Sequence, residues 1–281
     1  MNLILEVNHL SKKYRDFTAV NDLSFSVHEG DVYGFLGQNG AGKSTTIRML
    51  LTLISPTSGE IRIFGKNLAS HRHDILAQTG AVIERPDLYK YLSAYDNLSV
   101  FAKMSGIKVS RKLIMDQLEL VGLADRSKDK VKTFSQGMKQ RLGIAVALVH
   151  NPKLIILDEP TNGLDPQGIA DMRNLILKLS RQMGKTVLVS SHLLSEIEVI
   201  ATRMLIIHNG KKIVEGYVQE MLDPAKTLVQ LDTTDNGLAM EYLQTTKWGT
   251  GASAAGKSIR LNINKNEIPQ LVSQLRKGVL V

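Results

Sequence analysis

Short apolar segments alternate with helix-like segments along residues 1–216. Residues 31–37, 153–159 and 186–192 are almost continuously apolar and are too short for buried helices. Residues 43–56 and 166–182 instead repeat apolar positions at helical spacing, and we expect Pro56 to stop the first of these helices. Apolar strands separated by helices are typical of a parallel sheet with helices on both faces, so the pattern predicts an α/β fold. Further strands are expected at residues 3–14, 59–67, 80–84, 203–210 and 211–216.

The strand pattern is interrupted between residues 87 and 150. Within this stretch, residues 91–106, 111–123 and 136–150 each carry apolar positions at helical spacing. The sequence therefore predicts a helical subdomain, 87–150, inserted into the α/β domain.

The pattern changes again after Gly216. Four segments then read in turn as strand, helix, strand and helix: 227–234, 237–246, 257–266 and 267–278. We therefore predict an α/β domain at 1–216 and a small α+β extension at 217–281.

Composition narrows the class of protein. The 281 residues are 43% hydrophobic and 22% charged, which is ordinary for a soluble globular protein, and there is no cysteine for a disulfide framework. The first residues lack the features of a signal peptide, and no apolar run approaches the ~20 residues of a membrane-spanning helix. The net charge is +8, but no cluster of Lys and Arg is dense enough to indicate a nucleic-acid partner. These features predict a cytoplasmic protein that could reach a membrane only through a partner.

Two segments match the phosphate-binding pattern GxxxxGK[ST]: residues 37–44, "GQNGAGKS", and residues 251–258, "GASAAGKS". A phosphate loop must follow a buried strand and open a helix, because its backbone N–H groups and the helix N-terminus hold the phosphates. Only the first match has these flanks. There we expect Lys43 to reach the β- and γ-phosphates of a nucleotide and Ser44 to hold Mg²⁺. The second match is followed by an alternating strand pattern, so we interpret it as a hairpin-type loop.

Two carboxylates end the apolar strand 153–159. In the same parallel sheet, the carboxyl end of this strand lies beside the phosphate loop, which brings Asp158 and Glu159 to the nucleotide. Asp158 is expected to bind the Mg²⁺ shell, and Glu159 to orient or deprotonate the attacking water.

Four motifs in this order resemble the ATPase subunit of ATP-binding cassette (ABC) transporters. They are the loop 37–44, "TFSQGMKQR" at 133–141, "LIILDEPTNGLDP" at 154–166 and "VLVSSH" at 187–192. The resemblance covers residues 3–216. It implies a P-loop NTPase sheet with a small N-terminal antiparallel β part, and a helical subdomain that touches integral membrane transporter subunits. It also implies ATP and Mg²⁺ as cofactors.

The resemblance further implies roles for single residues. Tyr14 corresponds to the aromatic residue that stacks on adenine, Val20 to an apolar contact beside it, and His192 to the histidine that touches the γ-phosphate. "FSQGM" matches the family signature LSGGQ only in Ser135 and Gly137, which would face the ATP of a second ABC ATPase subunit across a dimer. The implied nucleotide-binding residues are Tyr14, Val20, Gly37, Asn39, Gly40, Ala41, Gly42, Lys43, Ser44, Thr45, Ser135, Gly137 and Asp165.

Glu84 departs from the family, which usually has glutamine at this position. Together with the "SxGMKQRL" signature, this glutamate resembles the bacitracin and lantibiotic self-protection branch of exporter ATPases. The resemblance suggests that Glu84 contributes to catalysis or to the metal site, or that it couples the site to the membrane subunits.

The sequence is compatible with three functions. The leading hypothesis is an ATPase on the inner face of the cell membrane that powers export through separate membrane subunits. The first alternative is a soluble ABC ATPase acting on ribosomes or DNA, although one cassette without a sustained heptad pattern is unusual for that class. The second is a module that binds ATP without hydrolysing it, against which Glu159 and His192 argue.

Overall fold

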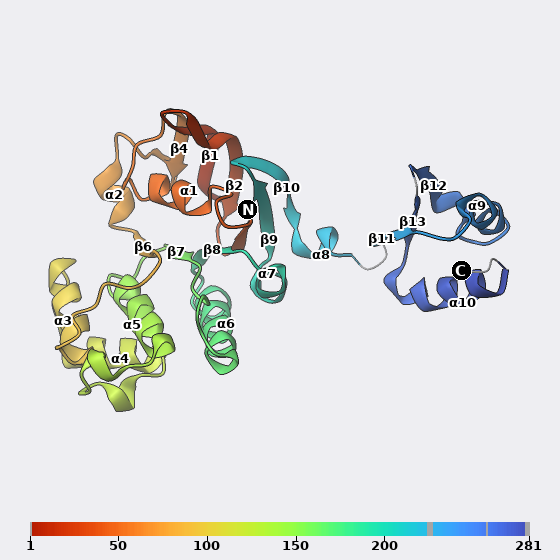
Figure 1. The fold of residues 1–281 in the computed structure, drawn as a ribbon. Coiled ribbons are helices and arrows are strands. Elements are labelled where there is room, and N and C mark those ends of the chain that lie inside the picture. The colour runs from red at the N-terminus through yellow and green to blue at the C-terminus, as the bar shows by residue number, and fades with distance from the viewer. Residues whose placement is uncertain (1, 224–226, 257, 279–281) are drawn as a thin grey trace. The chain divides into compact units, whose positions relative to one another are not determined.

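The computed structural model describes residues 2–223, 227–256 and 258–278. The chain divides into two compact units, Met1–Val218 and Gln219–Val281 (Figure 1).

A six-stranded sheet forms the centre of the first unit, in the order β10-β9-β3-β8-β7-β6. Neighbouring strands from β9 to β6 run parallel, and β10 is antiparallel to β9 at one edge. Every residue of β3, β7 and β8 is buried, which explains why these segments are continuously apolar. The predicted α/β class is thereby confirmed. The strands are β3 Val32–Leu36, β6 Thr79–Val82, β7 Leu154–Asp158, β8 Thr186–Ser191, β9 Arg203–His208 and β10 Lys211–Tyr217.

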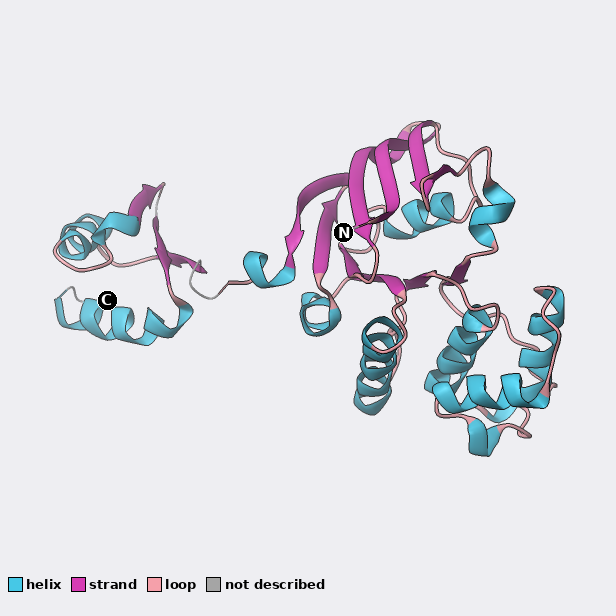
Figure 2. Cartoon of the chain, turned by 180° about the vertical axis from the view of Figure 1, so that it is seen from behind, coloured by secondary structure: helices cyan, strands magenta, loops and turns pink. Residues whose placement is uncertain are grey.

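An antiparallel sheet of four strands packs beside the first helix, in the order β2-β1-β4-β5 (Figure 2). Its strands are β1 Leu3–Tyr14, β2 Phe17–His28, β4 Ser58–Ile63 and β5 Lys66–Asn67. Sequence analysis did not identify β2. The strand is irregular: its pairing with β1 shifts register several times, and Asp22 has a φ of 53°. These irregularities break the alternation in the first half of the strand, whereas residues 23–28 alternate between buried and half-buried positions.

The helix after the phosphate loop is shorter than expected. This helix, α1, spans Lys43–Leu50 and ends well before Pro56. Thr52 has a φ of 56°, and the N–H groups of Leu53 and Ile54 both donate to the carbonyl oxygen of Arg48. The left-handed residue therefore terminates the helix, as in common C-terminal capping motifs. The other helices of the α/β part are α2 Arg72–Leu76, α6 Pro166–Arg181 and α7 Leu194–Ile200. The short helix α8, Val218–Met221, spans the boundary between the two units.

Three helices gather below β6 in Figure 1. They are α3 Ala94–Met104, α4 Arg111–Leu120 and α5 Gln136–Leu148, with 3-10 turns at Ala124–Arg126 and Val131–Thr133 between the last two. Each helix begins at a serine whose hydroxyl accepts a hydrogen bond from a backbone N–H in the first turn. Their inward faces carry fully buried residues, including Leu98, Ile114 and Leu142. Local capping and an apolar stripe thus explain why these helices were visible in the sequence.

The second unit is a small α+β structure. Its strands β11 Thr227–Leu231, β12 Ala252–Ala255 and β13 Ser258–Ile263 form a sheet in the order β11-β13-β12, and its helices are α9 Asn236–Gln244 and α10 Ile268–Gly278. Short 3-10 turns lie at Gly249–Gly251 and Lys265–Glu267. A separate apolar core contains Leu243, Trp248, Leu261 and Leu271.

The second match to the phosphate-binding pattern falls on a hairpin in this unit. Ala255 pairs with Ser258 at the end of β12 and β13, and Gly256 in the connection has a φ of 61°. Lys257 lies outside the described residues. A segment between two antiparallel strands opens no helix, so the hairpin interpretation is confirmed.

Across residues 2–223, 227–256 and 258–278, no helix has the length and apolar character required to cross a membrane.

Candidate functional site

The phosphate loop connects the buried strand β3 to the helix α1. Gly42, directly before the helix, has a φ of 106°, and a Cβ on it would lie 2.6 Å from the carbonyl oxygen of Ala19. A Cβ on Gly37 would lie 2.7 Å from the carbonyl oxygen of Ile207. Both positions therefore require glycine, one for its backbone conformation and both for space. Asn39 and Gly40 at the turn of the loop are exposed.

Lys43 lies inside this loop and is only 5% exposed. Its Nζ donates to the carbonyl oxygens of Gly37, at 2.6 Å, and Gln38, at 3.2 Å. The same Nζ lies 3.1 Å from Oε1 of Glu159. The three ammonium hydrogens thus face three oxygens at the opening of the loop, where a nucleotide phosphate would compete for them.

Glu159 connects the phosphate loop to His192. Its Oε2 lies 2.6 Å from Nδ1 of His192, while its Oε1 contacts Lys43. The side chain of Glu159 is 18% exposed, and its backbone adopts a φ of 49°, which is unfavourable for a residue other than glycine. Such backbone strain persists where the surroundings hold a residue in place, and it is common at functional sites. The structure therefore brings together Lys43, Glu159 and His192, three of the site residues that were predicted from the sequence.

Asp158 and Ser44 offer oxygen ligands beside this group. Asp158 is almost fully buried, and its Oδ1 accepts a hydrogen bond of 2.5 Å from the hydroxyl of Ser190. Hydroxyl and carboxylate oxygens are ligands that Mg²⁺ uses together with nucleotide phosphates and water. The donor set at this point therefore fits a magnesium ion.

A pocket of about 610 Å³ opens between the phosphate loop and the helical subdomain. Gln136 and Gln140 of α5 line it from one side, and sequence analysis missed both of them. The sequence offered little signal, because both residues lie in the polar first half of α5 beside Lys139 and Arg141, and only the structure shows that Gln140 is buried. Other lining residues are Ser44, Glu84, Asp158 and Glu159.

Glu84 lines this pocket, yet its carboxylate forms an ion pair with Arg48 of α1. The side chain of Glu84 is 62% exposed, and its backbone has a φ of 56°. The carboxylate contacts the helix that follows the phosphate loop, and neither Ser44 nor Asp158 is among its ion-pair or hydrogen-bond partners. Glu84 was predicted to take part in metal binding and catalysis, but its carboxylate pairs with Arg48 and not with the candidate metal ligands.

Tyr14 and Val20 lie at the antiparallel sheet. Tyr14 ends β1, is partly exposed, and has the Lys12 ammonium 5.0 Å from its ring centroid. Val20 is fully buried, and one of its methyl carbons would lie 3.4 Å from a Cβ on Gly42. Val20 therefore packs against the phosphate loop at Gly42, whereas the ring of Tyr14 remains accessible to a planar ligand.

Ser135 and Asp165 both cap helices. The Ser135 hydroxyl accepts from the N–H of Met138 at 3.2 Å, and Oδ1 of Asp165 accepts from the N–H of Gly168 at 3.0 Å. Gly137, in the first turn of α5, has room for a Cβ, with Leu164 at 3.8 Å. Each residue thus has a local structural contact as well as its predicted role toward a second subunit.

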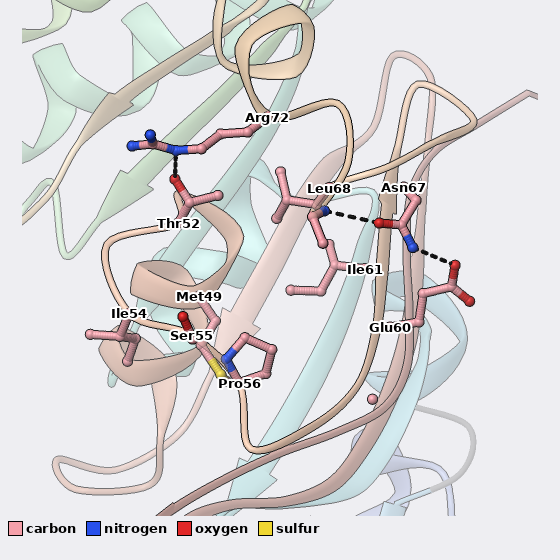
Figure 3. Close-up of a pocket in the computed structure, with 12 residues that line it drawn as sticks. Met49, Thr52, Ile54, Ser55, Pro56, Glu60, Ile61, Asn67, Leu68 and Arg72 are labelled. Carbon is pink, nitrogen blue, oxygen red and sulfur yellow. Dashed lines mark hydrogen bonds between the residues drawn. The ribbon is translucent and has the colours of Figure 1, made fainter.

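A second pocket, of about 510 Å³, lies behind α1 (Figure 3). Met49 contributes to its apolar wall. Its polar groups are paired with one another: Arg72 donates to Thr52 at 2.5 Å, and Asn67 donates to Glu60 at 2.8 Å. This pocket contains neither the phosphate loop nor the carboxylates Asp158 and Glu159.

Comparisons with known proteins identify the family of this chain. The profile of the ABC transporter family matches residues 20–162. The chain is 51% identical to the bacitracin transport ATP-binding protein BcrA of Bacillus licheniformis over 87% of this chain and 79% of that protein. It is 38% identical to the protein of the same name from Enterococcus faecalis, over 100% of this chain and 91% of that one. It is also 47% identical to the lantibiotic transport ATP-binding protein SrtF of Streptococcus pyogenes, over 75% of this chain and 90% of that one.

Solved structures show the same fold. The ABC transporter component cbiO1 of Clostridium perfringens superposes with a TM-score of 0.72 over 88% of this chain and 96% of that one, at 24% identity. A dimeric ATP-binding cassette bound to ADP and Pi superposes with a TM-score of 0.69 over 76% of this chain and 99% of that one, at 25% identity. The predicted P-loop fold and the resemblance to the bacitracin and lantibiotic branch are therefore confirmed. This chain belongs to the ABC transporter family, as an ATP-binding subunit that hydrolyses ATP.

Proposed function

We propose that this subunit hydrolyses ATP at the phosphate loop to drive export of a peptide antibiotic through separate membrane subunits. The observation that carries the proposal is the contact of Glu159 with both Lys43 and His192 at the opening of the loop. The names of the relatives supply the substrate class, since two of them transport bacitracin and one transports a lantibiotic.

In this proposal the phosphates of ATP lie along residues 37–45, and the backbone N–H groups and the α1 terminus neutralise part of their charge. Lys43 holds the β- and γ-phosphate oxygens. Ser44 and Asp158 hold Mg²⁺, which when bound neutralises the negative charge that develops on the phosphates. The aromatic ring of Tyr14 stacks on the adenine.

Glu159 then acts on the attacking water. A phosphate bound at Lys43 competes with Glu159 for the ammonium group and leaves the Glu159 carboxylate available as a proton acceptor. His192 donates from Nδ1 to that carboxylate across the 2.6 Å contact and so orients it. Its other ring nitrogen faces the γ-phosphate and donates to it when the ring carries both protons. The water attacks the γ-phosphorus, its proton moves to Glu159, and ADP leaves as inorganic phosphate forms.

We further propose that two such subunits enclose the ATP. Ser135 and Gly137 lie at the N-terminus of α5, which attracts phosphate through its free N–H groups. Asp165 begins the neighbouring helix α6. A related cassette is a dimer bound to ADP and Pi, which supports this arrangement.

The membrane partner can be tested by co-purification from the inner membrane. We expect a tagged form of the chain to retain an integral membrane protein after mild detergent extraction, and to transfer resistance to a peptide antibiotic when both are expressed. Retention of ribosomes or DNA in place of a membrane protein would instead support the soluble alternative. None of the relatives cited above is named for a ribosomal or DNA-related role.

Substitution of Glu84 tests how the site communicates with the partner. The exposed pair between Glu84 and Arg48 contributes at most about 1 kcal/mol, so both Glu84→Gln and Glu84→Ala should change hydrolysis by the isolated subunit less than about fivefold. We expect cellular resistance to fall much more, because the residue connects the pocket to the start of the helical subdomain. ATPase rate and resistance measured side by side for both variants provide the test.

Arg48→Ala is the matched variant, since it removes the partner of Glu84 but leaves the carboxylate. If Glu84 acted mainly on Mg²⁺, hydrolysis would fall steeply in Glu84→Ala and remain in Arg48→Ala. Unchanged rate together with unchanged resistance would reduce Glu84 to a neutral difference from the family.

A further inference from the structure

Glu196 is a buried carboxylate outside the site described so far. It lies in α7 and is 7% exposed. Its Oε2 accepts two hydrogen bonds of 2.7 Å, one from the hydroxyl of Thr161 and one from the hydroxyl of Ser191. Among the described residues, no Lys, Arg or His forms an ion pair with it. A carboxylate without a cationic partner is costly to bury, so its placement calls for a reason beyond packing.

Both hydroxyl donors are close in sequence to the candidate catalytic groups, one in a loop and one at the end of a strand. Thr161 follows Glu159 in the loop after β7, and Ser191 directly precedes His192 at the end of β8. Each donor is itself tied to its loop. The carbonyl oxygen of Thr161 accepts from the N–H of Leu164, and the Ser191 hydroxyl accepts from the N–H of Leu193. One carboxylate oxygen therefore joins two loops that have no covalent connection near this point.

The joined loops are the ones that bring Glu159 and His192 together. The 2.6 Å contact between these two side chains depends on the relative position of the ends of β7 and β8. A second link at the same edge comes from Ser190, whose hydroxyl donates to Asp158 and accepts from the N–H of Glu159. Ser190 joins the two strands directly before Glu159, whereas Glu196 joins Thr161, two residues after Glu159, to Ser191, the residue before His192. Two hydrogen-bonded links next to Glu159 and His192 thus hold these segments together.

We propose that Glu196 is a positioning residue for ATP hydrolysis. Its carboxylate holds the loop after β7 against the loop after β8, so that Glu159 meets His192 in the geometry needed to take a proton from water. The inference rests on the proposed roles of Glu159 and His192. It adds to them a residue that touches neither the nucleotide nor the reacting atoms.

The test separates positioning from general stability by comparing kcat with KM. Glu196→Ala leaves both hydroxyls without their acceptor, and Thr161→Val removes one donor with little change of shape. Since ATP binds along residues 37–45, which neither substitution contacts, we expect KM for ATP to stay within about twofold. Misplacing the base should lower kcat by about tenfold or more. Thr161→Ser restores the hydroxyl and should recover most of the rate.

Glu198→Gln is the matched control, because Glu198 is an exposed carboxylate on the same helix. Its kcat and KM should equal those of the unchanged protein. Melting temperature is measured for every variant in the full-length chain. If Glu196→Ala does not fold, Thr161→Val and Thr161→Ser carry the test alone.

Two results would overturn the proposal. One is an unchanged kcat in Thr161→Val, and the other is a loss of kcat accompanied by an equal rise in KM and a large fall in melting temperature. Glu159→Gln is measured in parallel, because it separates the proposed role of Glu159 as the base from the proposed positioning role of Glu196. If it keeps the full rate, the role of Glu159 fails; if it is inactive while Thr161→Val is fully active, only the positioning role of Glu196 fails.

Discussion

Replacing Lys43 with alanine is expected to abolish ATP hydrolysis. The substitution removes the buried ammonium group that faces the oxygens of Gly37, Gln38 and Glu159 at the opening of the phosphate loop. This ammonium group carries the positive charge that would hold the β- and γ-phosphates and stabilise the negative charge of the transition state. We therefore expect the rate of hydrolysis to fall by about 10³-fold or more. The rate of hydrolysis is measured as phosphate release by the purified protein in the presence of Mg²⁺ and ATP.

Lys257→Ala is the control for this prediction. Lys257 occupies the same position in the second sequence match, but that match falls on the connection between β12 and β13. Hydrolysis should therefore stay within about twofold of the unchanged protein, as for most substitutions remote from a site. An equal loss in both variants would mean that the two matches had been interpreted wrongly.

Replacing Glu159 with glutamine should separate ATP binding from hydrolysis. Glutamine keeps the shape of the side chain and can still contact Lys43 and His192, but it cannot accept a proton from water. We expect the rate to fall by about 10²-fold or more while ATP remains bound. Because the nucleotide then persists, gel filtration with ATP should show a stable dimer that the unchanged protein forms only briefly.

The control is Glu198→Gln, which makes the same chemical change at an exposed position. It should leave both the rate and the elution volume unchanged. A Glu159→Gln variant that stayed monomeric at high protein and ATP concentration would contradict the enclosed dimer of isolated subunits. Full hydrolysis by that variant would contradict Glu159 as the base.

Much of the site could be predicted because its residues are local in sequence. The phosphate loop has a glycine pattern whose backbone demands, such as the φ of 106° at Gly42, are met within a few residues. Asp158 and Glu159 were found because they end a fully buried strand. His192 follows β8 in the same way. In each case a short apolar run and the residue at its carboxyl end carry the information, because such ends meet along one edge of a parallel sheet.

Other features depend on partners far along the chain. The direction of the Glu84 side chain is set by Arg48, and Glu196 acquires its meaning only from Thr161 and Ser191. In the sequence, Glu196 is an ordinary acidic residue near the start of a short helix. Nothing in its neighbourhood indicates that it is buried, since burial results from packing against two other loops.

The sequence by itself therefore determined the α/β class, the helical insertion, and the identities of the phosphate loop and its acidic partners, since each is specified by periodicity or by a short motif. Only the tertiary structure decided that β2 joins the antiparallel sheet, that α1 ends at Leu50 rather than at Pro56, and that Glu159 contacts Lys43 and His192 together. The physical reason is the range of the interactions. Backbone conformation and helix capping act between near neighbours, whereas hydrogen bonds and ion pairs among side chains depend on strands that the fold brings side by side from distant parts of the chain.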